Sequence, residues 1–481
     1  MFAVSAGAQA ACDIDEGRPS QVARAFLSVT QAANAQEAEN WAEATRSLQN
    51  AVKLLSERGA IGPNELGRSF LLGKALSLYL NNPTQPLVTD AASLGFPAEA
   101  GTIDLVSAVD SLFEVVEQSQ PGCLETTADW RRQKGWVGLL QSAADHLNAG
   151  RNDSAIVAAN RAMTLGESPY ATMVLGHVAN NQNQLANALR FYERTVELAS
   201  DSIYTDLRFE TLVNIGNLAT DAAADTVPEA KAALAQRAAT AYQAVMQNTT
   251  DSTFVRAARR GLSRSALLMG DTTSFRGVYA PLIANPAGYT YDDLVVSGVD
   301  AAQAGLWADA VKLFDGAVER NTWHRDALYN GALSHARQGT HDRALALVQK
   351  LVQLDPSNPD NWMLTAEIYN GLAKAAARNP AQQKTMNEAV TANFSKAQDM
   401  KHRVAFSEFA KTASGATLGG IIENRSDAAR SFTLRVEFLD AAGAVVGTGE
   451  AAVGPVAPGA EGRFTITAAA PNVAGFRYAP L

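Results

Sequence analysis

The sequence is poor in cysteine, histidine and aromatic residues, and it contains no long apolar run. Its 481 residues include two cysteines and six histidines, and aromatic residues make up 7%. No apolar stretch approaches the roughly 18–20 residues that a membrane-spanning helix needs, so we predict no transmembrane segment. The histidines are scattered, and none has a second histidine or cysteine at the spacing of a metal site. The sequence therefore predicts no metal and no other cofactor.

Clusters of basic residues and catalytic motifs are also missing. The formal net charge is −9, which disfavours a nucleic-acid partner. The segment 67–75, GRSFLLGKA, has the wrong glycine spacing for a phosphate-binding loop, and Ala75 lacks the hydroxyl that would hold magnesium. It is more typical of the interior of an apolar helix. Neither a Gly-x-Ser-x-Gly elbow nor a cysteine with a neighbouring histidine is found, so we predict that the protein is not an enzyme.

The two cysteines, Cys12 and Cys123, allow one intramolecular disulfide. Such a bond persists only in an oxidising compartment. The alternative is two unrelated buried thiols. We predict the Cys12–Cys123 disulfide.

The first residues, MFAVSAGAQAACDIDEG, are unusual for a cytosolic protein. Ala8-Gln9-Ala10 has the small-x-small pattern of a signal-peptidase site, although the charged leader and most of the apolar core are missing. We interpret residues 1–11 as the remnant of a signal peptide and expect the mature chain to begin near Ala11. The alternative is chance in an alanine-rich sequence. Lipidation of Cys12 is a minor option, since Gln9 stands where an aliphatic residue belongs. We expect a periplasmic or extracellular location in a bacterium.

A 34-residue period is the strongest positive signal. Counted from Tyr291, Arg325 and Pro359, position 8 is always small and position 4 always large. Position 20 is alanine in two units, and large apolar residues stand at position 24. Position 4 is Leu294, Leu328 and Trp362, and position 8 is Gly298, Ala332 and Ala366. Position 20 is Ala310 and Ala344, and position 24 is Phe314 and Val348. Pro356, at position 32 of the Arg325 unit, would end the second helix of that unit.

This pattern resembles the tetratricopeptide repeat, a pair of helices repeated every 34 residues. Looser units begin at Ala25, Trp136, Pro169 and Phe209, and a further pair with a long loop is expected between residues 66 and 120. The Phe209 and Pro359 units carry insertions, which we expect to form projecting loops. The resemblance implies that residues 12–403 form a mainly α solenoid of about seven helix pairs.

The period changes from 3.6 to 2 after about residue 403. Residues 431–440, SFTLRVEFLD, place Phe432, Leu434, Val436 and Phe438 on one face. We therefore expect residues 404–481 to form a small immunoglobulin-like antiparallel β-sandwich that folds independently. Residues 436–440 are similar to the motif of the bacterial FxLYD-type domain, although only Asp440 is literally kept.

The resemblance also implies a concave groove lined by the first helix of each repeat. The groove candidates are Tyr170, Met173, His177, Asn214, Asn217, Tyr329, Asn330, Arg337, Met363 and Asn370. The alternative is that Tyr329 and Met363 merely pack against neighbouring units. Members of the family that bind a C-terminal carboxylate use lysine and asparagine in the groove, and the lysines are missing here.

Position 2 of three successive units is an aspartate: Asp292, Asp326 and Asp360. These carboxylates either form an acidic ladder along the groove or offset the positive end of each helix dipole, and we favour the second interpretation.

Taken with the repeat resemblance, these features predict an exported, non-enzymatic interaction scaffold or assembly factor that binds a protein or peptide partner in its groove. The alternative is a structural subunit of a cell-envelope or surface complex that assembles through the β-sandwich.

Overall fold

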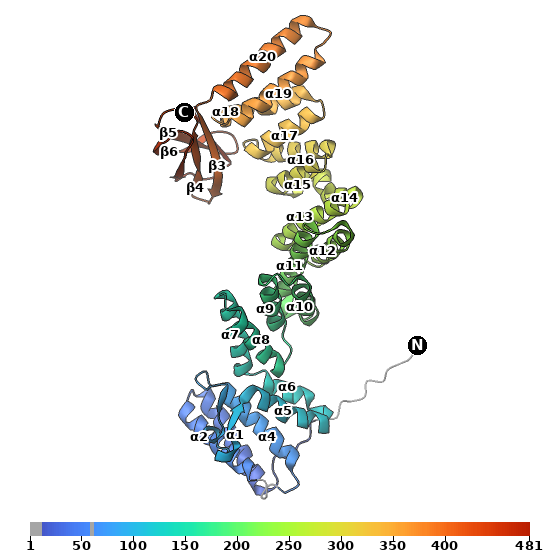
Figure 1. Ribbon diagram of the computed structural model, residues 1–481, viewed down its shortest axis with the longest axis vertical. Coiled ribbons are helices and arrows are strands. Elements are labelled where there is room, and N and C mark those ends of the chain that lie inside the picture. Colours follow the sequence, from blue (N-terminus) through green and yellow to red (C-terminus); the bar gives the residue numbers. More distant parts are fainter. Residues whose placement is uncertain (1–11, 58–61) are drawn as a thin grey trace, which may run out of the picture. The chain divides into compact units, whose positions relative to one another are not determined.

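The computed structural model of the chain describes residues 12–57 and 62–481 (Figure 1). Residues 1–11, the predicted remnant of a signal peptide, lie outside the described residues, as does the predicted mature start at Ala11. Tertiary contacts divide the chain into two compact units. The first comprises the residues up to Thr226 together with Thr240–Thr249, and the second comprises Val227–Ala239 and Thr250–Leu481.

Helix pairs build the first unit (Figure 1). The pairs are α1 (Ser20–Glu37) with α2 (Trp41–Ser56), α4 (Glu65–Leu80) with α5 (Leu105–Ser119), α7 (Lys134–Asn148) with α8 (Asn152–Leu165), and α9 (Pro169–Asn181) with α10 (Leu185–Leu198). The short helix α6 (Leu124–Arg131) follows α5, and α11 (Thr205–Ala224) packs on α10. Helix α12 (Pro228–Asn248) contributes residues to both units.

The second unit begins with four helix pairs. They are α13 (Ser252–Met269) with α14 (Thr272–Ala284), α15 (Tyr291–Gln303) with α16 (Trp307–Arg320), α17 (Arg325–Arg337) with α18 (His341–Leu354), and α19 (Pro359–Ala375) with α20 (Pro380–Asp399). Helices α15, α17 and α19 begin at the three residues from which the sequence period was counted. The predicted mainly α solenoid with a C-terminal sandwich is confirmed.

The sequence analysis missed the pair α13/α14. Helix α13 has 18 residues, against 13 in both α15 and α17. The longer first helix shifts the second out of the 34-residue register, and Pro281 inside α14 hides its helical pattern further.

The expectation that the two insertions form projecting loops is wrong, because they lengthen helices instead. Helices α11 and α12 have 20 and 21 residues, and α19 and α20 have 17 and 20. The inserted segments are rich in alanine, which favours the helix more than any other residue. Each long pair is joined by a short turn, such as residues 376–379 between α19 and α20.

The small residues of the repeat let its two helices lie close together. A Cβ atom added to Gly298 in α15 would lie 2.8 Å from the ring of Phe314 in α16. A Cβ atom added to Gly176 in α9 would lie 2.5 Å from the ring of Tyr192 in α10. These distances are shorter than van der Waals contact. The large side chain at position 24 therefore packs directly on the backbone at position 8, where only a small residue fits.

Helix α4 contains the segment 67–75, which supports its assignment to an apolar helix rather than a phosphate-binding loop. All of residues 69–80 are buried. The predicted long connection between α4 and α5 is present, and it carries a small antiparallel hairpin of β1 (Val88–Asp90) and β2 (Thr102–Asp104).

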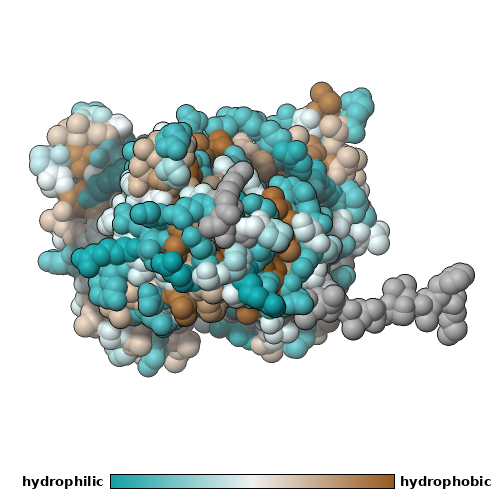
Figure 2. Space-filling model, turned by 90° about the horizontal axis from the view of Figure 1, so that it is seen from below, coloured by the Kyte–Doolittle hydropathy of each residue, from teal (hydrophilic) through white to brown (hydrophobic). Residues whose placement is uncertain are grey.

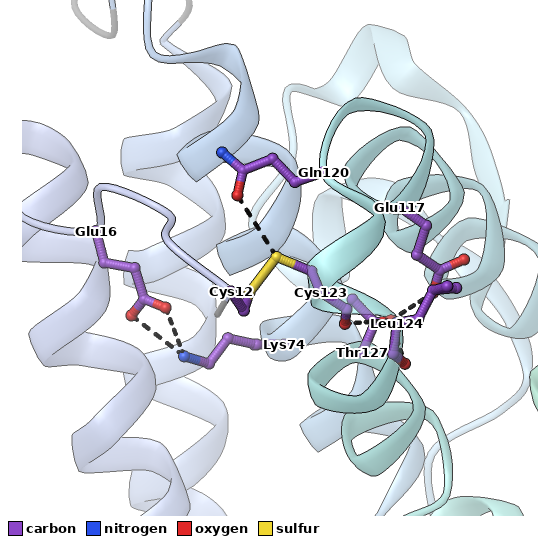
Figure 3. The surroundings of a disulfide bond; sticks show 8 residues. All are labelled: Cys12, Glu16, Lys74, Glu117, Gln120, Cys123, Leu124 and Thr127. Carbon is purple, nitrogen blue, oxygen red and sulfur yellow. Dashed lines mark hydrogen bonds and ion pairs between the residues drawn. A yellow bond between two sulfur atoms is a disulfide. The ribbon is translucent and has the colours of Figure 1, made fainter. Parts of the chain in front are cut away.

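The segment that precedes α1, residues 12–18, is fastened to the first unit, and we refer to it as the N-terminal strap (Figure 3). A disulfide joins Cys12 to Cys123, with the Cα atoms 4.4 Å apart. Asn64, just before α4, donates hydrogen bonds to the backbone oxygens of Asp15 and Arg18 at 2.7 and 2.5 Å. The strap therefore connects the α5–α6 junction with the start of α4.

Lys74 in α4 lies beneath the strap. Its ammonium donates to Glu16 of the strap at 2.9 Å (Figure 3). The same nitrogen lies 4.8, 5.0 and 5.6 Å from the ring centroids of Phe70, Trp130 and Phe26. Because the side chain of Lys74 is only 11% exposed, the strap closes an aromatic cage around a charged group.

The face of the molecule drawn in Figure 2 is mostly polar. Figure 2, in which the molecule is seen from below, shows a largely hydrophilic face interrupted by small hydrophobic patches. Leu27 of α1 is 58% exposed, whereas its neighbour in sequence Phe26 is 37% exposed and contributes to the cage around Lys74.

Six strands form the C-terminal sandwich. They are β3 (His402–Lys411), β4 (Ala416–Asn424), β5 (Arg430–Leu439), β6 (Val445–Val456), β7 (Glu461–Ala468) and β8 (Gly475–Tyr478). One sheet has the order β3-β4-β7 and the other β6-β5-β8, with all pairs antiparallel. The four residues predicted to share one face, Phe432, Leu434, Val436 and Phe438, are all buried in the core. The similarity of residues 436–440 to the FxLYD-type motif stays a prediction.

The sandwich packs on the repeats of its own unit through a buried polar contact. Tyr478 of β8 donates a hydrogen bond to the carboxylate of Asp355, and the backbone N–H of Ser357 donates to the Tyr478 hydroxyl at 3.2 Å. The backbone N–H of Val404 in β3 donates to the carbonyl oxygen of Ser357 at 3.0 Å. The turn between α18 and α19 is therefore the platform on which the sandwich sits.

Arg325 extends this interface at the start of α17. Its guanidinium donates to the carbonyl oxygens of Phe476 and Leu354 at 2.7 and 3.1 Å. It also stacks on the Phe476 ring, 3.3 Å from the centroid. Burial lowers the pKa of Arg325 to about 10, against the attraction of Asp355, so the guanidinium remains charged at neutral pH. A buried cation held in this way makes the docking geometrically specific.

Candidate functional site

Three helices of the second unit border a hollow of about 500 Å³, which we call the α17–α20 hollow. Of the ten groove candidates, Tyr329 in α17 and Met363 and Asn370 in α19 line it together. Phe394 and Val390 of α20 also line it. The first helices of two successive repeats thus bring predicted residues together, and the lengthened α20 adds an apolar wall that the sequence analysis did not assign to the groove.

The α17–α20 hollow combines apolar area with acidic edges. Met363 is 38% exposed and Phe394 is 47% exposed, so two large apolar side chains face solvent there. Asp360 and Glu367 also line the hollow. Burial, reinforced by these two carboxylates, raises the pKa of the Tyr329 hydroxyl. The hydroxyl therefore stays protonated and can donate a hydrogen bond to a ligand.

Two further candidates in this region have partners within the chain. Arg337 of α17 pairs with Glu367 of α19 at 3.4 Å, at the edge of the hollow. The Asn330 side chain donates to the backbone oxygen of Asp326 at 2.9 Å, one turn earlier on its own helix. Asn330 is not among the residues that line the hollow.

His177 and Asn217, in the first unit, support buried tyrosines. The Tyr192 hydroxyl lies 3.0 Å from Nδ1 of His177, and the Tyr242 hydroxyl donates to the Asn217 side chain at 2.7 Å. Both polar residues stand at position 9 of their repeats, opposite a tyrosine at position 24, when the Phe209 unit is counted without its insertion of about ten residues. Where position 24 is Phe314, position 9 is Val299. A tyrosine at position 24 is thus accompanied by a polar residue at position 9. This pairing can be read in the sequence, and it indicates that His177 and Asn217 serve the packing of their own repeats.

The remaining candidates of the first unit are Tyr170, Met173 and Asn214. Tyr170 is 48% exposed, and its ring packs edge-on against Tyr204 with centroids 5.7 Å apart. Met173 and Asn214 are half-buried. Burial lowers the pKa of nearby His177, against the attraction of Glu210, so its imidazole is mainly neutral at pH 7.

The three aspartates at position 2 each stand in the first turn of a helix, as the dipole interpretation requires. Two also have basic neighbours. Asp292 lies 3.6 Å from His324, a contact that lowers the pKa of the carboxyl, and Asp360 pairs with Arg403 of β3 at 2.9 Å. The position at the helix start and these contacts give the aspartates a role in the fold.

The sequence analysis missed the residues that dock the sandwich. The repeat pattern singles out Pro356 as a helix end but not its neighbours Asp355 and Ser357, which are 4% and 1% exposed. Polar residues are common in turns, and nothing in a single sequence distinguishes a solvated turn from one that receives a second domain.

Comparisons with known proteins agree with the repeat geometry. Residues 296–359, which run from α15 to the start of α19, match the family described as Tetratricopeptide repeat. This segment therefore contains tetratricopeptide repeats, as predicted. Among curated proteins, none matches the chain.

Several solved structures are similar to parts of the chain. A tetratricopeptide repeat protein from Parabacteroides merdae ATCC 43184 is 13% identical, with 55% of this chain and 98% of that chain covered and a TM-score of 0.32. The apo form of RapI is 10% identical, with coverages of 78% and 98% and a TM-score of 0.32. The MamA protein is 16% identical, with coverages of 48% and 91% and a TM-score of 0.26.

Among the described residues, no helix combines the length and apolar composition that crossing a membrane requires.

Proposed function

We propose that the chain is a non-enzymatic scaffold that holds a segment of a partner protein in the α17–α20 hollow. The observation that carries this proposal is the exposure of Met363 and Phe394 in one concave surface. Exposed apolar groups that line a common hollow are typical of interaction sites. Stacked repeats of this type present extended inner surfaces for binding.

The lining suggests how a partner segment would be held. Methionine and aromatic side chains supply contact area without demanding one shape. The Tyr329 hydroxyl and the Asn370 amide can hydrogen-bond an extended or helical backbone. Affinity would come from the apolar side chains of the partner, and orientation from these two polar groups.

We also propose that the protein is exported to the periplasm or the exterior of a bacterial cell. The Cys12–Cys123 disulfide supports this location, because disulfides persist in oxidising compartments. The alternative function, a structural subunit that assembles through the sandwich, receives less support. Strands β3 and β8 face the repeats, and β6 and β7 lie against each other, which disfavours pairing of a sandwich edge with a neighbour.

Site-specific photo-crosslinking tests the proposed site. A benzophenone amino acid at Met363 should capture a partner from the envelope fraction, and the same group at Gln383, which is partly exposed on α20 outside the hollow, should not. Replacing Tyr329 and Asn370 by alanine should weaken the captured complex by about 1–2 kcal/mol for each important contact. Equal capture from both positions, or capture only from Gln383, would refute the hollow as the binding site.

A further inference from the structure

A second cavity, of about 360 Å³, lies within the second unit between the repeats and the sandwich, and we call it the junction cavity. On the repeat side it is lined by the first turns of α15 and α17, including Tyr291. On the sandwich side it is lined by strands β3 and β8, including Phe406, Phe409 and Phe476. It shares none of its lining residues with the α17–α20 hollow. With Trp323 of the repeat side, five aromatic rings line this small cavity and form a surface suited to flat or cationic groups.

The chain already places two cations in this aromatic lining. The Lys411 ammonium, at the end of β3, donates to the Tyr291 hydroxyl at 2.6 Å. It lies 5.1 Å from the ring centroid of Tyr291 and 5.4 Å from that of Phe409. On the other side of the cavity, the Arg325 guanidinium stacks on Phe476. Cations are therefore the groups that this lining accommodates.

The junction cavity is lined by more carboxylates than permanent cations. Three carboxylates line it, on Asp292, Asp326 and Glu408, against the two cations, and the imidazole of His324 lies beside Asp292. Asp292 contacts His324, but within the described part of the chain neither Asp326 nor Glu408 has an ion-pair partner within 4.0 Å. Arg325 is committed to backbone oxygens and cannot move without undocking the sandwich. A further cation would meet a net attraction there.

Unlike Arg325, Lys411 can move out of the cavity without breaking contacts between the sandwich and the repeats. Its side chain is exposed at the end of β3, beside the turn that leads into β4, and its one hydrogen bond is to a tyrosine hydroxyl. Its departure would expose the faces of Tyr291 and Phe409 without disturbing the packed interface.

We propose that the junction cavity binds a basic side chain, arginine or lysine, of a protein partner, and that Lys411 occupies the site until the partner displaces it. A guanidinium can stack on the rings and donate to Glu408 or Asp326. The site gives the sandwich a role in recognition that does not depend on the α17–α20 hollow.

The test uses the full chain and small probes, so the identity of the partner is not needed. Binding of N-acetyl-arginine amide and N-acetyl-lysine amide is measured by ligand-observed NMR, with N-acetyl-citrulline amide as the neutral control. We expect the cationic probes to bind more tightly than citrulline amide. Lys411→Met removes the resident cation but keeps an apolar stem, and should tighten binding about two- to fivefold, the scale of an exposed cation–π contact.

Two charge-neutralising variants locate the site. Glu408→Gln should weaken binding of the cationic probes about two- to fivefold. Glu461→Gln, at an exposed glutamate of β7 outside the cavity, should leave it unchanged. The proposal is overturned if the wild type and Lys411→Met bind arginine amide no better than citrulline amide, or if both glutamate variants behave alike. Because Lys411 and Glu408 are exposed, the variants should keep the wild-type unfolding profile, which circular dichroism checks.

Discussion

The N-terminal strap and strand β8 both fasten a short segment to a helical scaffold, but they do so with different chemistry. The strap is held by a covalent bond, Cys12–Cys123, and by the ion pair of Glu16 with Lys74. Strand β8 is held by a buried hydrogen-bond network around Tyr478 and by the stacked Arg325. The attachment of the strap therefore depends on the redox state of its surroundings. The attachment of β8 depends on its buried hydrogen-bond partners, because the loss of one would leave another polar group unsatisfied.

The two lysine sites show the same contrast. Lys74 lies in a closed cage of three rings beneath Glu16, and its charge is fully committed. Lys411 lies in an open cavity with two rings and a single hydroxyl. Because its cage is closed, Lys74 is a structural element. Because its cavity is open, Lys411 can be displaced by another cation. The same side-chain types therefore stabilise a fold in one unit and offer a binding site in the other.

The largest expected effect comes from breaking the disulfide. Replacing Cys12 and Cys123 by serine should destabilise the first unit by about 2–5 kcal/mol, because the bond closes a loop of 111 residues in the unfolded chain. Hydrogen exchange would be measured in α4 of the first unit and in α17 of the second. Exchange should accelerate in α4 and stay unchanged in α17.

A control separates the disulfide from side effects of the substitutions. Reductant should reproduce the effect in the wild type and have no effect on the variant without cysteines. Equal exchange in α4 with and without the disulfide would show that the strap adds nothing to the stability of the first unit.

The second test breaks the attachment of the sandwich. Tyr478→Phe removes the hydroxyl that donates to Asp355 and accepts from the N–H of Ser357, and leaves both groups buried. We expect a loss of about 1–3 kcal/mol, the scale of unsatisfied buried polar groups. Urea unfolding of the second unit and proteolysis near Lys401 would report it. Tyr369→Phe, on α19 of the same unit, is the matched control and should change stability by less; an equal loss in both would contradict the role of Tyr478.

How far the sequence predicts this molecule depends on whether a feature is periodic. The starts of α15, α17 and α19 follow from a 34-residue repeat, because close packing of Gly298 on Phe314 imposes a small residue and a large one at fixed spacing. The pair α13/α14 escapes that analysis because its longer first helix breaks the register. Residues that serve the groove are predicted in part, since Tyr329, Met363 and Asn370 share a face of repeating helices, whereas Phe394 lies on a second helix.

Contacts between the repeats and the sandwich could not be predicted from the sequence. Asp355 and Arg325 meet Tyr478 and Phe476 across more than a hundred residues of chain, and no local pattern encodes that meeting. Independent folding of residues 404–481 stays a prediction. The sandwich has its own core, but Phe476 and Tyr478 serve both that core and the interface, so separation would uncover them.

The smallest expected effect concerns the dependence of stability on pH. Its sign differs between a group in the second unit and a group in the first. Burial raises the pKa of Asp300 in α15 to about 6, against the attraction of Arg260. The folded second unit therefore binds this proton more tightly than the unfolded chain does, and it loses stability as the pH rises from about 4 to about 6. Burial lowers the pKa of His177 in the first unit, so that group acts in the opposite direction: its contribution is present above about pH 6.5 and is lost as the pH falls.

Asp300→Asn removes the titrating group and should flatten the pH dependence of the second unit. A pKa that moves from about 4 to about 6, a net shift that already includes the attraction to Arg260, corresponds to at most about 3 kcal/mol above pH 7. Because the amide that replaces the carboxylate is also costly to bury, we expect a gain of about 1 kcal/mol. At pH 4 the carboxyl is protonated in the fold, so variant and wild type should be nearly equal there. Urea unfolding of the second unit at pH 4 and pH 7.5 measures both values, and a gain of the same size at both pH values would show that burial of the charge is not its cause.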